Sequence, residues 1–173
     1  MKYSSVILAL CLTCSTACKV SNAHKRQEVL NKATMTVLSK KFYPAVDFAD
    51  IKHFDRASKT YKVPHAVLST VLHLESSGGI NTRDRFERHL GTSSVGHFQV
   101  LKTTARYIGF APILLYQTKY NALAAAKYLR LMHDKHGTWC KSIRAYNGAG
   151  KRADAYLNKA KAFYAKKFGR ELK

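Results

Sequence analysis

Beyond residue 23 the apolar side chains recur every three or four positions, and the two-residue alternation typical of a half-buried strand is hard to find. A period of three to four puts apolar side chains on one face of an α-helix, and Gly, Pro or Asn bounds each periodic segment. We therefore predict an all-α fold with little or no sheet. The predicted helices cover residues 28–42, 51–61, 65–76, 101–108, 114–133, 140–146 and 153–168, and residues 81–90 are predicted to be a charged connector, helical in part.

The first 23 residues are predicted to be a secretory signal rather than part of the fold. Lys2 precedes an apolar run over residues 6–17, which has the length of a signal core and is too short to cross a bilayer. Two cleavage sites remain open. Ser21-Asn22-Ala23 favours cleavage after Ala23, whereas Ser15-Thr16-Ala17-Cys18 favours lipoprotein processing before Cys18. Either way we expect an exported protein in the periplasm or cell envelope, lipid-anchored in the second case.

Cysteine usage follows from this cleavage. Cys11 and Cys14 lie inside the signal and Cys18 is removed or lipidated, so the mature chain keeps Cys140 alone and forms no internal disulfide. Cys140 is predicted to be a structural thiol. No metal is expected, because His133 and His136 have no third ligand nearby in the sequence, and no cofactor is expected.

The chain is strongly basic and poor in acids. Its 173 residues include 30 Lys plus Arg and only 10 Asp plus Glu, a formal charge of +20 that falls to +18 when residues 1–23 are removed. Such a charge is typical of nucleic-acid binders, but export argues against nucleic acid. We expect instead electrostatic association with an anionic wall or membrane surface. Residues 153–173 set lysines beside aromatics, and we favour a closing helix packed on the domain over a membrane-surface helix.

Among the few acids, Glu75 occupies an unusual place. Leu68, Val71 and Leu72 form one apolar stripe, and the next position on that stripe is 75. A carboxyl group held against the core has a raised pKa, which a general acid working near neutral pH requires. The alternative is a glutamate that only pairs with a basic side chain at the domain edge.

Two later segments present polar groups at the ends of elements. Residues 96–100 read Gly-His-Phe-Gln-Val, which sets an aromatic and an amide after a flexible glycine. Tyr146 and Asn147 precede Gly148, so a helix ends there with both side chains displayed. Sugar rings need both apolar surface and neutral hydrogen-bonding groups. Taken alone, Asn-Gly is also an ordinary helix stop.

Together these segments resemble the soluble lytic transglycosylase catalytic domain, whose members cleave the glycan strands of bacterial peptidoglycan and share a lysozyme-like helical fold. The resemblance spans about residues 50–150 in the family's order. It is carried by Tyr61-Lys62-Val63-Pro64, Glu75-Ser76, Gly96-His97-Phe98-Gln99-Val100, Thr103-Thr104-Ala105, Asn121, Tyr128-Leu129, Trp139 and Ala145-Tyr146-Asn147-Gly148. It implies a catalytic domain over residues 49–152, preceded by a helical extension over 24–48.

The resemblance also implies roles for single residues. Glu75 matches the family's catalytic acid and base, and the substrate-binding residues that it implies are Ser76, Phe98, Gln99, Tyr146 and Asn147, with the Tyr146 hydroxyl expected near the catalytic carboxyl. The implied reaction cleaves the bond between N-acetylmuramic acid (MurNAc) and N-acetylglucosamine (GlcNAc) and leaves a 1,6-anhydro end. No water is consumed, so one carboxyl group suffices, in contrast to the pair used by most glycosidases.

The chain departs from the family pattern at two places. His97 and Phe98 replace the usual Leu-Met, which predicts a bulkier wall beside the sugar. The gap between Glu75 and Gly96 is longer than usual and contains Asp84 and Glu87. Either acid is a candidate second carboxylate for a lysozyme-type hydrolase (a muramidase). We favour a solvated, ion-paired turn.

Two classes of function therefore stay open: an enzyme acting through Glu75, and a non-catalytic basic protein that binds cell wall or nucleic acid. The expected partner is the glycan strand. The sequence leaves the biological setting open among wall turnover, a local opening for a secretion or conjugation apparatus, and attack on other cells. A monomer is expected.

Overall fold

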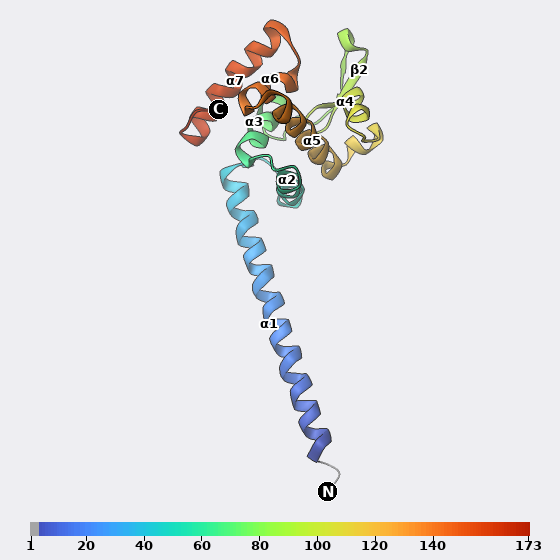
Figure 1. The fold of residues 1–173 in the computed structure, drawn as a ribbon, viewed down its shortest axis with the longest axis vertical. Coiled ribbons are helices and arrows are strands. Elements are labelled where there is room, and N and C mark those ends of the chain that lie inside the picture. The colour runs from blue at the N-terminus through green and yellow to red at the C-terminus, as the bar shows by residue number, and fades with distance from the viewer. Residues whose placement is uncertain (1–3) are drawn as a thin grey trace. The chain divides into compact units, whose positions relative to one another are not determined.

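The computed structural model describes the backbone of residues 4–173 and the side chains of residues 23–173. Contacts divide the chain into two units, Met1–Val37 and Leu38–Lys173. Residues 4–37 of the first unit lie in helix α1 (Ser4–Lys41), whose last four residues belong to the second unit. The second unit then contains α2 (Phe48–Tyr61), α3 (His65–Ser76), β1 (Arg85–Glu87), the 3-10 turn η1 (Arg88–Leu90), β2 (Thr92–Val95), β3 (Val100–Leu101), α4 (Lys102–Tyr107), η2 (Pro112–Tyr116), α5 (Thr118–His136), α6 (Trp139–Asn147) and α7 (Gly150–Phe168) (Figure 1).

The helix predicted over residues 28–42 is the last part of the longer α1. The predicted signal over residues 1–23 falls mostly outside the described side chains, so the two cleavage sites and the lipidation of Cys18 stay predictions. In the part of the chain that the structure describes, no helix has both the length and the hydropathy needed to span a membrane.

The second unit is built around the helices that the apolar periodicity predicts. In α2 the side chains of Ile51, Phe54 and Ala57 are fully buried. Helix α5 packs against α2 and α6, and α7 packs against α6 and α3. Because a helix that buries one stripe gains more from packing than from its intrinsic propensity, these contacts stabilise the unit.

A small antiparallel sheet stands beside the helices, in the order β1-β2-β3. Arg85 pairs with Ser94, and Val95 pairs with Val100. Residues 85–95 therefore form a hairpin, whereas we predicted a partly helical connector over 81–90; only η1 is helical there. Strands of two to four residues are too short to show a two-residue period. The prediction of a mostly helical, lysozyme-like domain with little sheet is confirmed.

The loop after β2 depends on one glycine. Gly96 has φ +76°, and a Cβ built there would lie 2.6 Å from the Asn121 side-chain nitrogen. That amide is nearly inaccessible to solvent; it accepts a hydrogen bond from the Phe98 backbone N–H (2.9 Å) and donates one to the Val95 carbonyl (2.8 Å). Only glycine allows this close approach, so Asn121 of α5 holds the loop that carries Gln99.

Candidate active site

Helix α3 brings Glu75 to the edge of the core. Leu68, Val71 and Leu72 are buried on the stripe below it, and the Glu75 side chain is only 8% exposed. Helix α3 ends at Ser76. The next residue, Ser77, adopts φ 53°, and its N–H donates to the Leu72 carbonyl. The carboxyl group therefore lies at the end of a helix, with the buried stripe on one side and the protein surface on the other.

Glu75 has a neutral hydrogen-bond partner and a nearby cation. The Tyr156 hydroxyl, from α7, donates to Glu75 Oε1 at 2.7 Å, and Arg85 Nη2 lies 3.8 Å from Oε2. Burial raises the pKa of Glu75 from 4.5 to about 7, against the lowering effects of Tyr156 and Arg85 and with a smaller raising effect of Glu87. At neutral pH a large share of this group is therefore protonated.

Glu75 faces a cleft of about 530 Å³. The hairpin and the segment after it form one wall, and α5, the end of α6 and the start of α7 form the other. The lining residues are Glu75, Arg85, Glu87, His89, Leu90, Ser94, Gln99, Leu101, Thr104, Tyr128, Ala145, Tyr146, Asn147, Gly148, Ala149 and Arg152. The cleft thus brings together Glu75, Gln99, Tyr146 and Asn147, which lie far apart in the sequence.

Gln99 lines the cleft, but its amide is also used inside the protein. Its Nε2 donates to the carbonyls of Gly96 (2.8 Å) and Arg83 (3.0 Å), and its Oε1 accepts from the Ser94 hydroxyl (3.0 Å). These contacts tie the hairpin to the loop after it. Gln99 thereby shapes the cleft wall.

Two tyrosines lie near Glu75, and only one of them forms a hydrogen bond to it. The Tyr146 hydroxyl donates to the Phe98 carbonyl (2.8 Å), and its ring packs beside Tyr128, with centroids 5.6 Å apart. The hydroxyl that reaches the carboxyl group belongs to Tyr156. Burial, with the nearby Glu75 charge, raises the pKa of both Tyr146 and Tyr156, so each stays a neutral donor.

Ser76 and Phe98 lie away from the cleft. The Ser76 hydroxyl donates to the Leu72 carbonyl (3.1 Å) and accepts from the Gly79 N–H (3.0 Å), which caps α3. Phe98 is fully buried and packs on Phe54 at 5.2 Å, and the His97 ring packs on Phe54 at 5.7 Å. The two substituted positions therefore face the core rather than the cleft, where a bulkier sugar wall was expected.

Of the two candidate second carboxylates, only one lines the cleft. Asp84 is not among the residues that line the cleft; it accepts a hydrogen bond from the Tyr116 hydroxyl (2.6 Å) and lies 3.5 Å from Lys102 Nζ. Glu87 does line the cleft, but its Oε1 accepts from Arg85 Nε at 2.7 Å and from Ser94 at 3.3 Å. One guanidinium thus stands near both Glu75 and Glu87.

Sequence reasoning missed Tyr156, Arg85 and Arg152. Tyr156 was grouped with the packing aromatics of the last helix, and the helical period does place it on the buried face of α7. Nothing local shows that this face meets α3. Among the described side chains, no group of three His, Cys, Asp or Glu is close enough to hold a metal ion.

A mostly helical domain whose cleft is lined by one buried carboxyl group is of the lysozyme-like class. The family model for the transglycosylase SLT domain matches residues 52–168, about two thirds of the chain and all of α3 and the cleft. The chain belongs to this family, as its motifs predicted, and so to proteins of the peptidoglycan lytic transglycosylase type. No curated protein sequence matches the chain at a significant level.

Proposed function

We propose that this chain is an exported lytic transglycosylase that cleaves the MurNAc–GlcNAc bond of peptidoglycan through Glu75 and leaves a 1,6-anhydro end. The observation that carries the proposal is the buried Glu75 carboxyl group, with its pKa raised to about 7, in the lining of the cleft. A carboxyl group with that pKa serves both as an acid and as a base near neutral pH.

The first step uses the neutral acid. Tyr156 donates to Oε1, so the proton of Glu75 sits on Oε2. Glu75 gives this proton to the glycosidic oxygen as the bond between that oxygen and the MurNAc anomeric carbon breaks. The Glu75 carboxylate that results keeps the Tyr156 hydrogen bond, and Arg85 at 3.8 Å favours its negative charge.

The second step closes the ring. The MurNAc 6-hydroxyl oxygen attacks the anomeric carbon, and its proton passes to the Glu75 carboxylate. One bond breaks, one forms, and Glu75 ends in its starting state without water. Gln99, Tyr146 and Asn147 are proposed to line the sugar site, because their side chains lie in the same cleft.

A muramidase is the second candidate, because Glu87 lines the cleft too. An inverting hydrolase needs a free carboxylate that activates water. Glu87 instead accepts hydrogen bonds from Arg85 and Ser94. We therefore favour the lyase.

The test is the mass of the products from purified sacculi. The lyase releases anhydro-ended muropeptides one water lighter than hydrolysed ends. Glu75→Gln should lower their release by about 10²–10⁴-fold, whereas the matched change Glu28→Gln, at an exposed position of α1, should leave it unchanged. Products that are one water heavier would assign the hydrolase, and undiminished release from Glu75→Gln would refute both enzymes.

The positive charge supports a location at the cell wall. At +20 the whole chain is attracted to the carboxylates of peptidoglycan and to anionic lipids, and salt should weaken this attraction. Sedimentation of the Glu75→Gln variant with sacculi should therefore fall as the salt concentration rises.

A further inference from the structure

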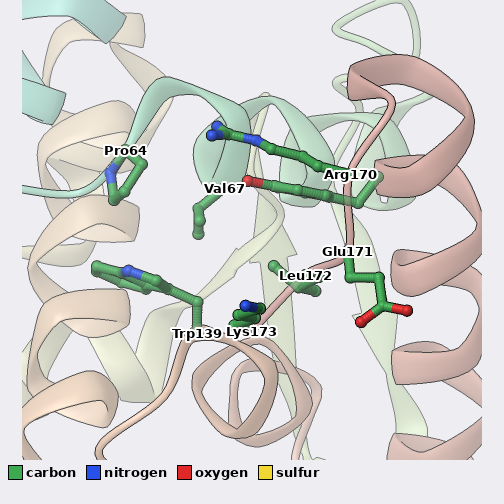
Figure 2. A pocket seen from close by; sticks show the side chains of 8 residues that line it. Pro64, Val67, Trp139, Arg170, Glu171, Leu172 and Lys173 are labelled. Carbon is green, nitrogen blue, oxygen red and sulfur yellow. The ribbon is translucent and has the colours of Figure 1, made fainter.

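A second cavity, of about 580 Å³, lies apart from the cleft at the start of α6. Trp139 lines it together with Pro64 and Val67, from the start of α3, and Tyr164, from the last turns of α7. None of its lining residues lines the cleft. Cavities of this size hold small organic ligands, and we refer to this one as the Trp139 pocket (Figure 2).

The Trp139 pocket and the cleft share three helices. Helix α3 contributes Val67 to the pocket and Glu75 to the cleft, eight positions apart, or about 12 Å at the helical rise. Helix α6 contributes Trp139 to the pocket and Tyr146 to the cleft. Helix α7 contributes Tyr164 to the pocket and its first turn to the cleft. A polymer of a few sugar rings is long enough to reach both.

The Trp139 indole is a half-buried platform. One side packs on the His133 ring, with centroids 4.1 Å apart and planes tilted by 37°. In the close view the indole lies next to Pro64, across the pocket from Glu171 (Figure 2). An indole combines a broad apolar face with a polar N–H, which suits the apolar face of a pyranose ring and a neighbouring oxygen.

The chain after α7 forms the opposite side of the pocket. The Cys140 backbone N–H donates to the Lys173 carbonyl (3.2 Å), and the Cys140 thiol donates to the Leu172 carbonyl (2.8 Å). Leu172 is buried at 7% exposure, and the Arg170 guanidinium lies 5.8 Å from the centre of the Tyr164 ring. The Trp139 pocket is therefore a shaped site with a fixed wall.

Its rim carries both signs of charge. Arg170, Glu171 and Lys173 are exposed, and none of them forms an ion pair within the part of the chain that the structure describes. A rim with both donors and acceptors matches a neutral ligand with hydroxyl and acetamido groups. Two cations and one carboxylate leave this rim with a net charge of +1, so its charge does not select between a saccharide and an acidic peptide. The choice of a saccharide rests on the indole, whose apolar face suits a pyranose ring.

We propose that the Trp139 pocket binds a neutral N-acetylated saccharide, a second segment of the glycan whose cleavage is assigned to the cleft. The choice of ligand rests on the proposed function. Binding of one polymer at two sites raises its local concentration at the cleft without adding a contact to the reacting bond. The pocket then favours long strands over short fragments.

The chain contains a single tryptophan, so its emission reports on this pocket. The full chain with Glu75→Gln, which prevents turnover, is titrated with the tetrasaccharide of N-acetylglucosamine. We expect a saturable change in Trp139 emission. Arg170→Ala removes rim donors and Tyr164→Phe removes one hydroxyl while keeping the ring, and each should raise the midpoint several-fold.

Three results would overturn the proposal. The first is an emission that does not change up to the solubility limit of the saccharide. The second is a change whose midpoint is the same with Arg170→Ala and Tyr164→Phe, which would trace the signal to the cleft. The third is a response to a γ-glutamyl-alanyl peptide at lower concentration than to the saccharide, which would assign the pocket to peptide instead.

Turnover separates binding from a structural role. In the chain with Glu75 intact, Arg170→Ala and Tyr164→Phe should lower the cleavage of polymeric strands several-fold and leave the cleavage of short soluble fragments unchanged. Equal losses on both substrates would show only damage to the fold. Because the emission titration needs no turnover, failure of the proposed lyase chemistry and failure of the pocket give different results.

Discussion

Helix α3 and the hairpin each bring a glutamate to the cleft, and the two glutamates have different surroundings. Glu75, on α3, is 8% exposed and accepts a hydrogen bond from a tyrosine; Glu87, on β1, is 22% exposed and accepts one from Arg85. Burial against packed helices raises the pKa of the Glu75 carboxyl group, whereas Glu87 lies in short contact with a guanidinium group. The comparison teaches that surroundings, not residue type, separate the proposed acid from the glutamate that holds the hairpin.

The largest effect should be on the cleavage rate. Glu75→Gln removes the proton donor and should lower the rate by about 10²–10⁴-fold, the range for general acid–base catalysis. Glu87→Gln keeps the size of the side chain, and its rate should stay within about threefold of the parent, since the proposed lyase passes no proton through Glu87. The measurement is the initial rate of sacculus digestion, and a larger loss from Glu87→Gln would reverse the assignment.

The next effect concerns how the hairpin wall is held. Asn121→Ala leaves the Phe98 N–H and the Val95 carbonyl without their buried partner, and should lower the free energy of unfolding by about 2–4 kcal/mol. Urea denaturation measures this. The exposed Asn158→Ala on α7 is the control, with an expected change within about 0.5 kcal/mol. Equal effects would mean that the loop does not depend on Asn121.

A third effect concerns how the stability of the protein depends on pH. The folded pKa of Glu75 is raised from 4.5 to about 7, so its ionisation in place costs stability as the pH rises through that window. Glu75→Gln avoids this cost, so the variant should match the parent at pH 4 and exceed it by up to about 3 kcal/mol at pH 8. Thermal unfolding across pH measures the difference. A gain that does not vary with pH would contradict a buried carboxyl group.

The smallest effect is a shift of the pH profile. The Tyr156 hydrogen bond lowers the pKa of Glu75, so Tyr156→Phe should move the alkaline limb of activity to higher pH and reduce the rate modestly. Tyr107→Phe, at an exposed ring, should leave the profile in place. A lower rate with an unmoved limb would mean that Tyr156 only packs.

Several parts of the site followed from local pattern. The stripe of Leu68, Val71 and Leu72 predicted the place of Glu75 because helical geometry alone aligns those positions. Ser76 and Phe98 were matched to substrate contacts but face the core. Side-chain direction at a helix end or after a positive-φ glycine depends on the packing around it, which motif order does not encode.

The sequence by itself determined the mostly helical fold, the family and the one acid placed on an apolar stripe, because these depend on residue spacing. It placed helix ends less well: the helix predicted over 114–133 is η2 followed by α5 (Thr118–His136), and the one predicted over 153–168 begins at Gly150. Only the tertiary structure decided which tyrosine reaches Glu75, that Arg85 stands between two glutamates, and that one set of helices carries a cleft at one end and the Trp139 pocket at the other. Those are contacts between residues far apart in the chain, as Tyr156 and Glu75 are, and only the packing of whole helices sets their distances.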